Sequence, residues 1–189
     1  MIPEPEALET IAKHRGDGVF ILSYVDTAWP KGTAGQLELP FVGCMGKISS
    51  FALGLALARP DRKIVVLDGD GSLLMNLGSL VTMANMNPPN LVYFVLENDV
   101  YQTTGGHPIP GAGRISFSGL AKAAGFTTVY EFDMIDEFQK HVKSILSDTG
   151  LTFVCLKVTT GGKRRPITRL LTTSLPRFKV ELEKSLPKA

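Results

Sequence analysis

Continuous apolar runs alternate with segments of helical periodicity along this chain, and this alternation constrains its fold more than any other feature. A strand made only of apolar residues is buried on both faces, as happens in parallel sheets that helices cover on each side. We therefore predict a doubly wound three-layer α/β/α fold with a mainly parallel sheet. The expected strands span 19–24, 63–71, 91–98, 127–130 and 151–158, and the expected helices span 5–14, 49–58, 72–86, 118–124, 135–146 and 177–184.

The composition is that of an ordinary globular protein, with 44% apolar residues, 20% charged residues and a formal net charge of +2. So small a charge gives no support for nucleic acid binding over the whole surface. The length fits one domain, which we predict to span 1–160. Residues 161–189 are expected to form a C-terminal basic extension. Its basic side chains either form a solvated face or attract an acidic substrate, and they are Lys163, Arg164, Arg165 and Arg169.

Neither a targeting segment nor a membrane span is expected. The N-terminus, MIPEPEALETIAKH, has prolines and acidic residues where a secretory signal needs basic and apolar ones, and no apolar run approaches membrane length. We therefore expect a cytoplasmic protein without membrane contact. Cys44 and Cys155 share no metal-binding or redox spacing, and Cys155, inside an apolar run, is expected to be a small core residue.

The segments DGDGS and ENDVY each follow an expected strand, so the fold places both at the edge of the sheet where ligands bind. Gly69 and Gly71 allow close approach to a ligand, and Ser72 opens a helix whose free N–H groups favour an anion such as phosphate. Asp70 would repel that anion unless a divalent cation lay between them. Asn98 offers a second oxygen ligand suited to magnesium.

Two other interpretations of DGDG stay open at this point. The motif is compatible with a tight strand-to-helix turn that binds nothing. It is also compatible with a dinucleotide-binding turn, although Leu74 stands where the G-x-G-x-x-G fingerprint has its third glycine.

The GDG at 69–71, the 26 residues 72–97 and then Asn98 resemble the thiamine diphosphate motif. The resemblance extends from FVGCMG to TFVCLKV, and it is to the pyrophosphate-binding domain of the thiamine diphosphate-dependent 2-oxoacid decarboxylases. Within that group the chain is most similar to phosphonopyruvate decarboxylase and to the β subunit of sulfopyruvate decarboxylase. These have a T-G-G or T-G-N sequence after the asparagine, and the corresponding segment here is YQTTGGHP.

The resemblance implies a cofactor, thiamine diphosphate, and a metal, Mg²⁺. It implies that Asp70 and Asn98 bind the metal by their side chains and Val100 by its carbonyl. The remaining implied contacts are Gly69, Gly71 and Ser72 with the diphosphate, Tyr101 closing the diphosphate loop, the Gly43 carbonyl with the cofactor's 4'-amino group, and Met45 beneath the thiazolium.

The substrate implied is a small anionic 2-oxoacid, with Thr103, Thr104 and His107 expected near it. The identity of the 2-oxoacid stays open, because His107 stands where these decarboxylases usually have glutamine.

Glu97 also departs from the pattern, since asparagine or aspartate is common at this position. It is interpreted either as a residue that orients the metal ligand or as a catalytic acid.

The resemblance also implies a partner. In such enzymes the glutamate that activates the cofactor belongs to a pyrimidine-binding domain, and this chain has room for only one domain of that size. We therefore expect the β subunit of a heteromeric decarboxylase, itself a homodimer, joined to an α subunit that carries the glutamate. The alternatives are the β subunit of a 2-oxoacid:ferredoxin oxidoreductase and a nucleotide-binding α/β domain.

Overall fold

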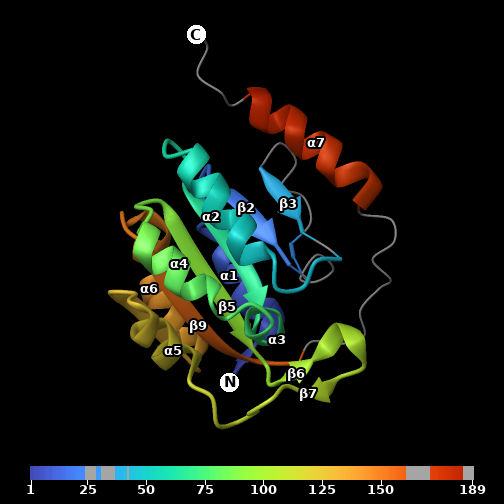
Figure 1. The fold of residues 1–189 in the computed structure, drawn as a ribbon, viewed down its shortest axis with the longest axis vertical. Helices are drawn as coiled ribbons and strands as arrows, with labels where there is room; N and C mark the ends of the chain where they lie inside the picture. Colours follow the sequence, from blue (N-terminus) through green and yellow to red (C-terminus); the bar gives the residue numbers. More distant parts are fainter. Residues whose placement is uncertain (24–28, 31–36, 42, 161–170, 185–189) are drawn as a thin grey trace.

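The centre of the computed structural model is a seven-stranded sheet in which every pairing is parallel (Figure 1). The structure describes residues 1–23, 29–30, 37–41, 43–160 and 171–184, without the side chains of 171–175 and 177. The basic residues expected to matter at 163–169 lie outside the described residues.

The strand order places the carboxyl ends of three strands, those that lead into the predicted site, next to one another. It runs β3 (Glu38–Pro40), β2 (Val19–Leu22), β4 (Ile64–Gly69), β5 (Leu91–Glu97) and β9 (Thr152–Thr159), and both β8 (Thr128–Phe132) and β1 (Ile2–Pro3) pair with β9. The carboxyl ends of β2, β4 and β5 therefore meet at one rim of the sheet.

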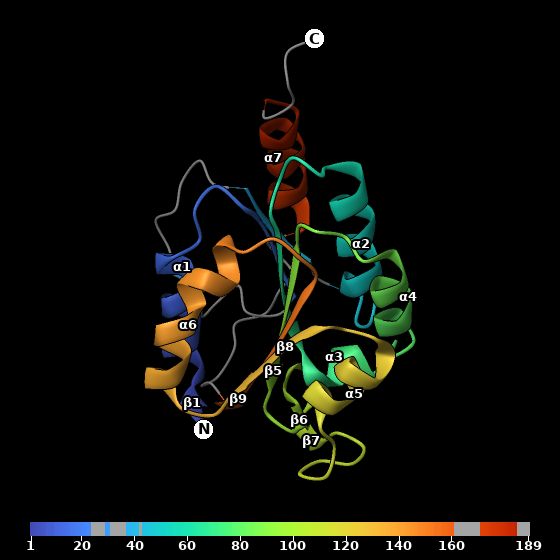
Figure 2. The same cartoon turned by 90° about the vertical axis from the view of Figure 1, so that its left-hand side faces the viewer.

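Helices cover both faces of the sheet, as Figure 2 shows. On one side lie α1 (Glu4–Lys13) and α6 (Ile135–Ser147). On the other lie α2 (Ile48–Ala58), α3 (Asp70–Leu74), α4 (Ser79–Met86) and α5 (Phe117–Ala124). The predicted three-layer α/β/α fold is confirmed.

The core consists of two apolar clusters, one on each face of the sheet. Alternate residues of a strand serve opposite clusters: Ile64 and Val66 of β4 face α2 and α4, whereas Val65 and Leu67 face α1 and α6. Burial on both faces explains why the central strands are apolar without interruption. Cys155 is fully buried in β9, as expected for a core residue.

The single helix predicted over 72–86 is wrong, because the structure divides it into α3 and α4. Tight turns replace the helical bonds between them, with the N–H of Met75 bonded to Ser72 O at 3.2 Å and that of Ser79 to Asn76 O at 2.9 Å. Gly78, directly before α4, has a low helix propensity and marks the break. The break leaves Met75 exposed at the surface.

Several short elements were not predicted from the sequence. These are β1, β3, and the hairpin of β6 (Val100–Tyr101) and β7 (His107–Pro108), whose strands are joined through a 3-10 turn at Gln102–Thr104. Strands of two or three residues are too short to show a periodicity.

The predicted C-terminal helix is confirmed and is longer than expected, since α7 spans Leu171–Lys184. It contacts β3 and buries Phe178 in the apolar cluster on the α2 side of the sheet. The division of the chain at residue 160 stays a prediction. None of the described helices has the length and apolar character needed to cross a membrane.

Asn90 joins the end of α2 to the start of β5 and provides a test of the fold. Its side-chain nitrogen lies 3.1, 2.9 and 2.8 Å from the carbonyl oxygens of Ala56, Arg59 and Arg62. We expect Asn90→Ala to lower the free energy of unfolding by about 1–3 kcal/mol, because buried carbonyls lose their donor. Urea denaturation measures this, and Asn90→Asp should lose at least as much because a carboxylate cannot donate.

The matched control is Asn87→Gly. Asn87 ends α4 with a left-handed φ of 42°, which glycine adopts without strain, so its stability should stay within about 0.5 kcal/mol of the parent. Equal stability of the Asn90→Ala protein would contradict the role assigned to the Asn90 side chain.

Candidate functional site

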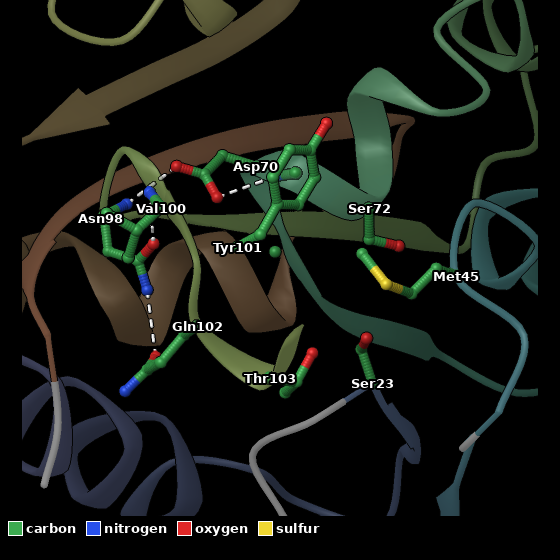
Figure 3. Close-up of a pocket in the computed structure, with 11 residues that line it drawn as sticks. Ser23, Met45, Asp70, Ser72, Asn98, Val100, Tyr101, Gln102 and Thr103 are labelled. Carbon is green, nitrogen blue, oxygen red and sulfur yellow. Dashed lines mark hydrogen bonds between the residues drawn. The ribbon is translucent and has the colours of Figure 1, made fainter. Parts of the chain in front are cut away.

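A pocket lies at the rim where β2, β4 and β5 end (Figure 3). It is built from the turn between β4 and α3, from the segment after β5, from the residue that follows β2 and from the loop before α2. The residues that line it are Ser23, Met45, Gly69, Asp70, Gly71, Ser72, Asn98, Val100, Tyr101, Gln102 and Thr103.

Asp70 links the two main walls of this pocket. Its Oδ1 accepts a hydrogen bond from the Gly71 N–H at 2.7 Å, and its Oδ2 accepts from the N–H groups of Asn98 at 2.9 Å and Asp99 at 2.7 Å. Burial raises the pKa of the Asp70 carboxyl, and these N–H donors act in the opposite direction by stabilising the carboxylate. The carboxylate is therefore held in a fixed position by backbone groups.

The segment after β5 is itself fixed by side chains. Asn98 accepts the Val100 N–H at its Oδ1 and donates from Nδ2 to Gln102 Oε1, each at 3.1 Å. Asp99 takes a left-handed φ of 63°, and its Oδ1 accepts the Gly113 N–H at 3.0 Å. The Asn98 side chain is therefore fixed by hydrogen bonds within its own loop.

The ring of Tyr101 packs against the backbone of Gly71. A Cβ atom built on Gly71 would lie 2.6 Å from two ring carbons of Tyr101, closer than real side chains approach. Any larger residue at position 71 would therefore displace the Tyr101 ring, and Figure 3 shows the ring over the turn that carries Asp70 and Ser72.

Met45 belongs to a loop that Ser72 ties to α3. The N–H of Gly46 donates to Ser72 Oγ at 3.0 Å, and Gly46 has a left-handed φ of 76°. The Met45 side chain lies beside Ser72 in the pocket, as Figure 3 shows. The hydrogen bond from Gly46 to the Ser72 hydroxyl thus helps to hold the loop that carries the thioether.

Asp68 lies at the end of β4 directly behind the pocket. Its Oδ1 accepts the Gly69 N–H at 2.9 Å, and its Oδ2 accepts the Tyr93 hydroxyl at 2.6 Å. Burial raises the pKa of this carboxyl to about 6, against the opposing effect of hydrogen bonds from Tyr93, Ser72 and Ser23.

Glu97 is not one of the described residues that line the pocket. Its Oε2 accepts a hydrogen bond from Cys155 Sγ at 2.9 Å, and burial raises the pKa of both groups. This geometry directs Glu97 to β9 and away from the pocket, which disfavours its interpretation as a catalytic acid.

The structure brings most of the predicted site residues together. Those that line the pocket are Met45, Gly69, Asp70, Gly71, Ser72, Asn98, Val100, Tyr101 and Thr103, whereas Gly43, Thr104 and His107 are exposed and do not line it. Sequence reasoning missed Ser23 and Gln102. The position of Ser23 directly after an apolar strand was a usable signal, because every other wall of the pocket also follows a strand end.

Comparisons with known proteins identify the family. Residues 24–156 match the family described as thiamine pyrophosphate enzyme, C-terminal TPP binding domain. Sulfopyruvate decarboxylase subunit beta of Methanocaldococcus jannaschii is 40% identical over 107 residues, which cover 57% of this chain and 56% of that protein. Phosphonopyruvate decarboxylase of Streptomyces viridochromogenes is 38% identical over 121 residues, which cover 64% of this chain and 30% of that protein.

The solved structures agree with this fold. Benzoylformate decarboxylase from Polynucleobacter necessarius superimposes with a TM-score of 0.71 at 19% identity, covering 86% of this chain and 34% of that one. The matches therefore span about half or less of these relatives' lengths. The chain belongs to the thiamine pyrophosphate enzyme family and contains its C-terminal cofactor-binding domain.

Proposed function

We propose that this chain is the cofactor-binding β subunit of a heteromeric thiamine diphosphate-dependent decarboxylase that acts on a small anionic 2-oxoacid. The observation that carries the proposal is the convergence of Asp70, Asn98 and Val100 on one pocket at the GDG turn. The similarity to sulfopyruvate decarboxylase subunit beta and to phosphonopyruvate decarboxylase supports the choice of substrate class.

The pocket fits a diphosphate bound through Mg²⁺. None of the described residues that line it is Lys, Arg or His, and a metal would supply the countercharge for a bound diphosphate. Asp70 and Asn98 supply side-chain oxygens and Val100 a carbonyl, and Asp70 Oδ1 keeps a lone pair beyond its bond to Gly71. We assign the metal to these three residues and the diphosphate to Gly69, Gly71, Ser72 and Tyr101.

The rest of the site would orient the reactive half of the cofactor. We assign Met45 to support of the thiazolium and Gly43 to the cofactor's 4'-amino group. We assign the 2-oxoacid to Thr103, which lines the pocket, and to Thr104 and His107, which follow it in the chain. When bound, thiamine diphosphate supplies an electron sink for the loss of carbon dioxide. The residues of this chain hold that cofactor in place and limit access of water to it.

The need for a partner is supported by the outer surface of α2 and α4. From Ile48 to Ala58 there is no charged residue, and from Asp70 to Met86 the only one is Asp70, which is buried. By contrast, α1 and α6 on the opposite layer carry many charges. In the layer that contains α2, α3 and α4, the exposed apolar residues form a surface that we call the uncharged face. These residues are Phe51, Leu57, Met75, Val81 and Met86.

A helix of another chain suits this face. Between α2 and α4 runs a groove with small residues, Ser50, Gly54 and Gly78 among them, which permit close approach. The hydroxyl of Ser79, which also lines the groove, is buried and has no hydrogen-bond partner in the described structure. The face is continuous with the cofactor pocket through Met75, which contacts the Gly46 turn. We therefore place the α subunit with the activating glutamate here, and a homodimer contact elsewhere.

Replacing Asp70 tests the metal assignment. We expect Asp70→Ala and the isosteric Asp70→Asn to weaken Mg²⁺-dependent thiamine diphosphate binding by more than about 100-fold, since even outer partners of metal ligands contribute roughly 10–100-fold. Calorimetry with the cofactor at saturating Mg²⁺ measures the change. Asp133→Asn, at an exposed carboxylate that does not line the pocket, is the control and should bind normally. Unchanged affinity in both Asp70 variants would remove Asp70 from the metal site.

Assembly tests the partner assignment. The isolated chain should release no carbon dioxide from sulfopyruvate, phosphonopyruvate or pyruvate with cofactor and Mg²⁺, and the subunit that co-purifies with it from its host should restore activity. Gly54→Lys should prevent that association. The partner would cover the groove between α2 and α4 and bury the added charge away from water.

The control for this substitution is Gln139→Lys, at an exposed position of α6 on the opposite layer. It adds the same charge and should leave association intact in size-exclusion chromatography. Full turnover by the chain alone would exclude the two-subunit proposal, and normal assembly of the Gly54→Lys protein would exclude this face as the docking site.

A further inference from the structure

Gln102 lines the candidate pocket, yet it has no role in the site proposed above. It begins the 3-10 turn between β6 and β7, and its side chain is half-buried. The side-chain nitrogen of Asn98, Nδ2, donates a hydrogen bond to Gln102 Oε1 at 3.1 Å, which Figure 3 shows as a dashed line. Gln102 is therefore in direct contact with one of the three residues assigned to the metal.

The side-chain amide of Asn98 has two different ends, and only the oxygen can bind a cation. The backbone N–H of Val100 donates to Oδ1 at 3.1 Å, and because an N–H needs an acceptor, this end of the amide must be the oxygen. The opposite end is then the NH₂ group, which finds its acceptor in Gln102 Oε1. The two hydrogen bonds thus agree on one orientation of the amide.

The observed orientation leaves the Asn98 oxygen able to bind a metal. A carbonyl oxygen has two lone pairs, so Oδ1 keeps one while it accepts from Val100. Rotation of the amide by 180° would place an NH₂ group where the oxygen stands and would break both hydrogen bonds. Only 7% of Asn98 is exposed, so water offers little replacement for a lost partner.

The β6–β7 hairpin fixes the backbone from which Gln102 reaches back to Asn98. Val100 pairs with Pro108 in antiparallel register, and the N–H of Gly106 closes the turn by donating to Tyr101 O at 2.9 Å. The 3-10 turn that Gln102 begins lies within this closed loop. The acceptor for the Asn98 amide is thus held on an ordered element, four residues further along the chain.

We propose that Gln102 is a positioning residue, which fixes the orientation of the Asn98 amide so that its oxygen faces the Mg²⁺ site. The proposal rests on the metal and thiamine diphosphate site proposed above. In this role Gln102 acts through Asn98 rather than as a metal ligand of its own.

The test substitution is Gln102→Met, which keeps the length of the side chain and removes its acceptor oxygen. The bond from Val100 remains, so we expect a partial loss. The apparent affinity for Mg²⁺ in the presence of thiamine diphosphate should fall about tenfold, at the lower end of what outer partners of metal ligands contribute. Calorimetry on the full chain, with Mg²⁺ titrated at a fixed cofactor concentration, measures the change.

The matched control is Gln139→Met, the same change at an exposed position of α6, which should bind Mg²⁺ as the parent does. If Gln102→Met does not fold, Gln102→Ala removes the same acceptor. Gln102→Glu keeps an acceptor for the Asn98 amide and should bind Mg²⁺ at least as tightly as the parent.

A double substitution tests whether Gln102 acts through Asn98. Asn98→Asp makes both ends of the side chain oxygen, so its rotation no longer decides whether an oxygen faces the metal. In that background Gln102→Met should lower the apparent Mg²⁺ affinity less than about threefold. Such non-additivity is expected of two residues that act as a unit.

The outcomes separate the hypotheses. A loss in Gln102→Met that is absent from Gln102→Glu and from the Asn98→Asp background supports the positioning role. Unchanged Mg²⁺ affinity in Gln102→Met, or an equal loss in both backgrounds, overturns it, while Mg²⁺-dependent cofactor binding by the parent leaves the proposed function intact. A parent protein that binds no thiamine diphosphate with Mg²⁺ contradicts the proposed function itself, and the role of Gln102 with it.

Discussion

Parallel hydrogen bonding between β4 and β5 is the constraint on which the rest of the site depends. The register runs from Ile64 opposite Leu91 to Gly69 opposite Leu96, so the two strands end side by side. Only this alignment brings the N–H groups of Asn98 and Asp99 to the carboxylate of Asp70, 28 and 29 residues earlier in the chain. The apolar residues that bury both strands thus determine the geometry of polar groups beyond their ends.

The sequence was sufficient for features that repeat or have a fixed spacing. Continuous apolar runs indicated the parallel sheet because burial on both faces leaves no alternation, and the interval from GDG to Asn98 indicated the pocket because it matches a known motif. The hydrogen bond between Asp68 and Tyr93 could not be predicted at that level. Tyr93 is 25 residues away from Asp68 and meets it only through the strand register, which a motif does not contain.

The two helical layers differ in a way that no single helix reveals. The segments 48–58 and 70–86 are ordinary apolar helices when considered alone. The break at Met75–Gly78 was missed because the helical spacing of apolar residues runs through it, from Leu73 and Leu77 to Leu80, despite the low helix propensity of Gly78. Only their placement side by side on the same layer turns them into one uncharged surface beside the pocket (Figure 2). Tertiary arrangement, rather than local pattern, identifies that surface as unlike the charged layer of α1 and α6.

The contact between Gly71 and Tyr101 has a consequence for how proteins of this kind diverge. Because any β-carbon at position 71 would overlap the ring at 101, a larger residue at 71 requires that ring to move or to be replaced by a smaller one. Steric exclusion thus couples the residues at these two positions. Relatives with a larger residue at 71 should therefore tend to have a smaller one at 101.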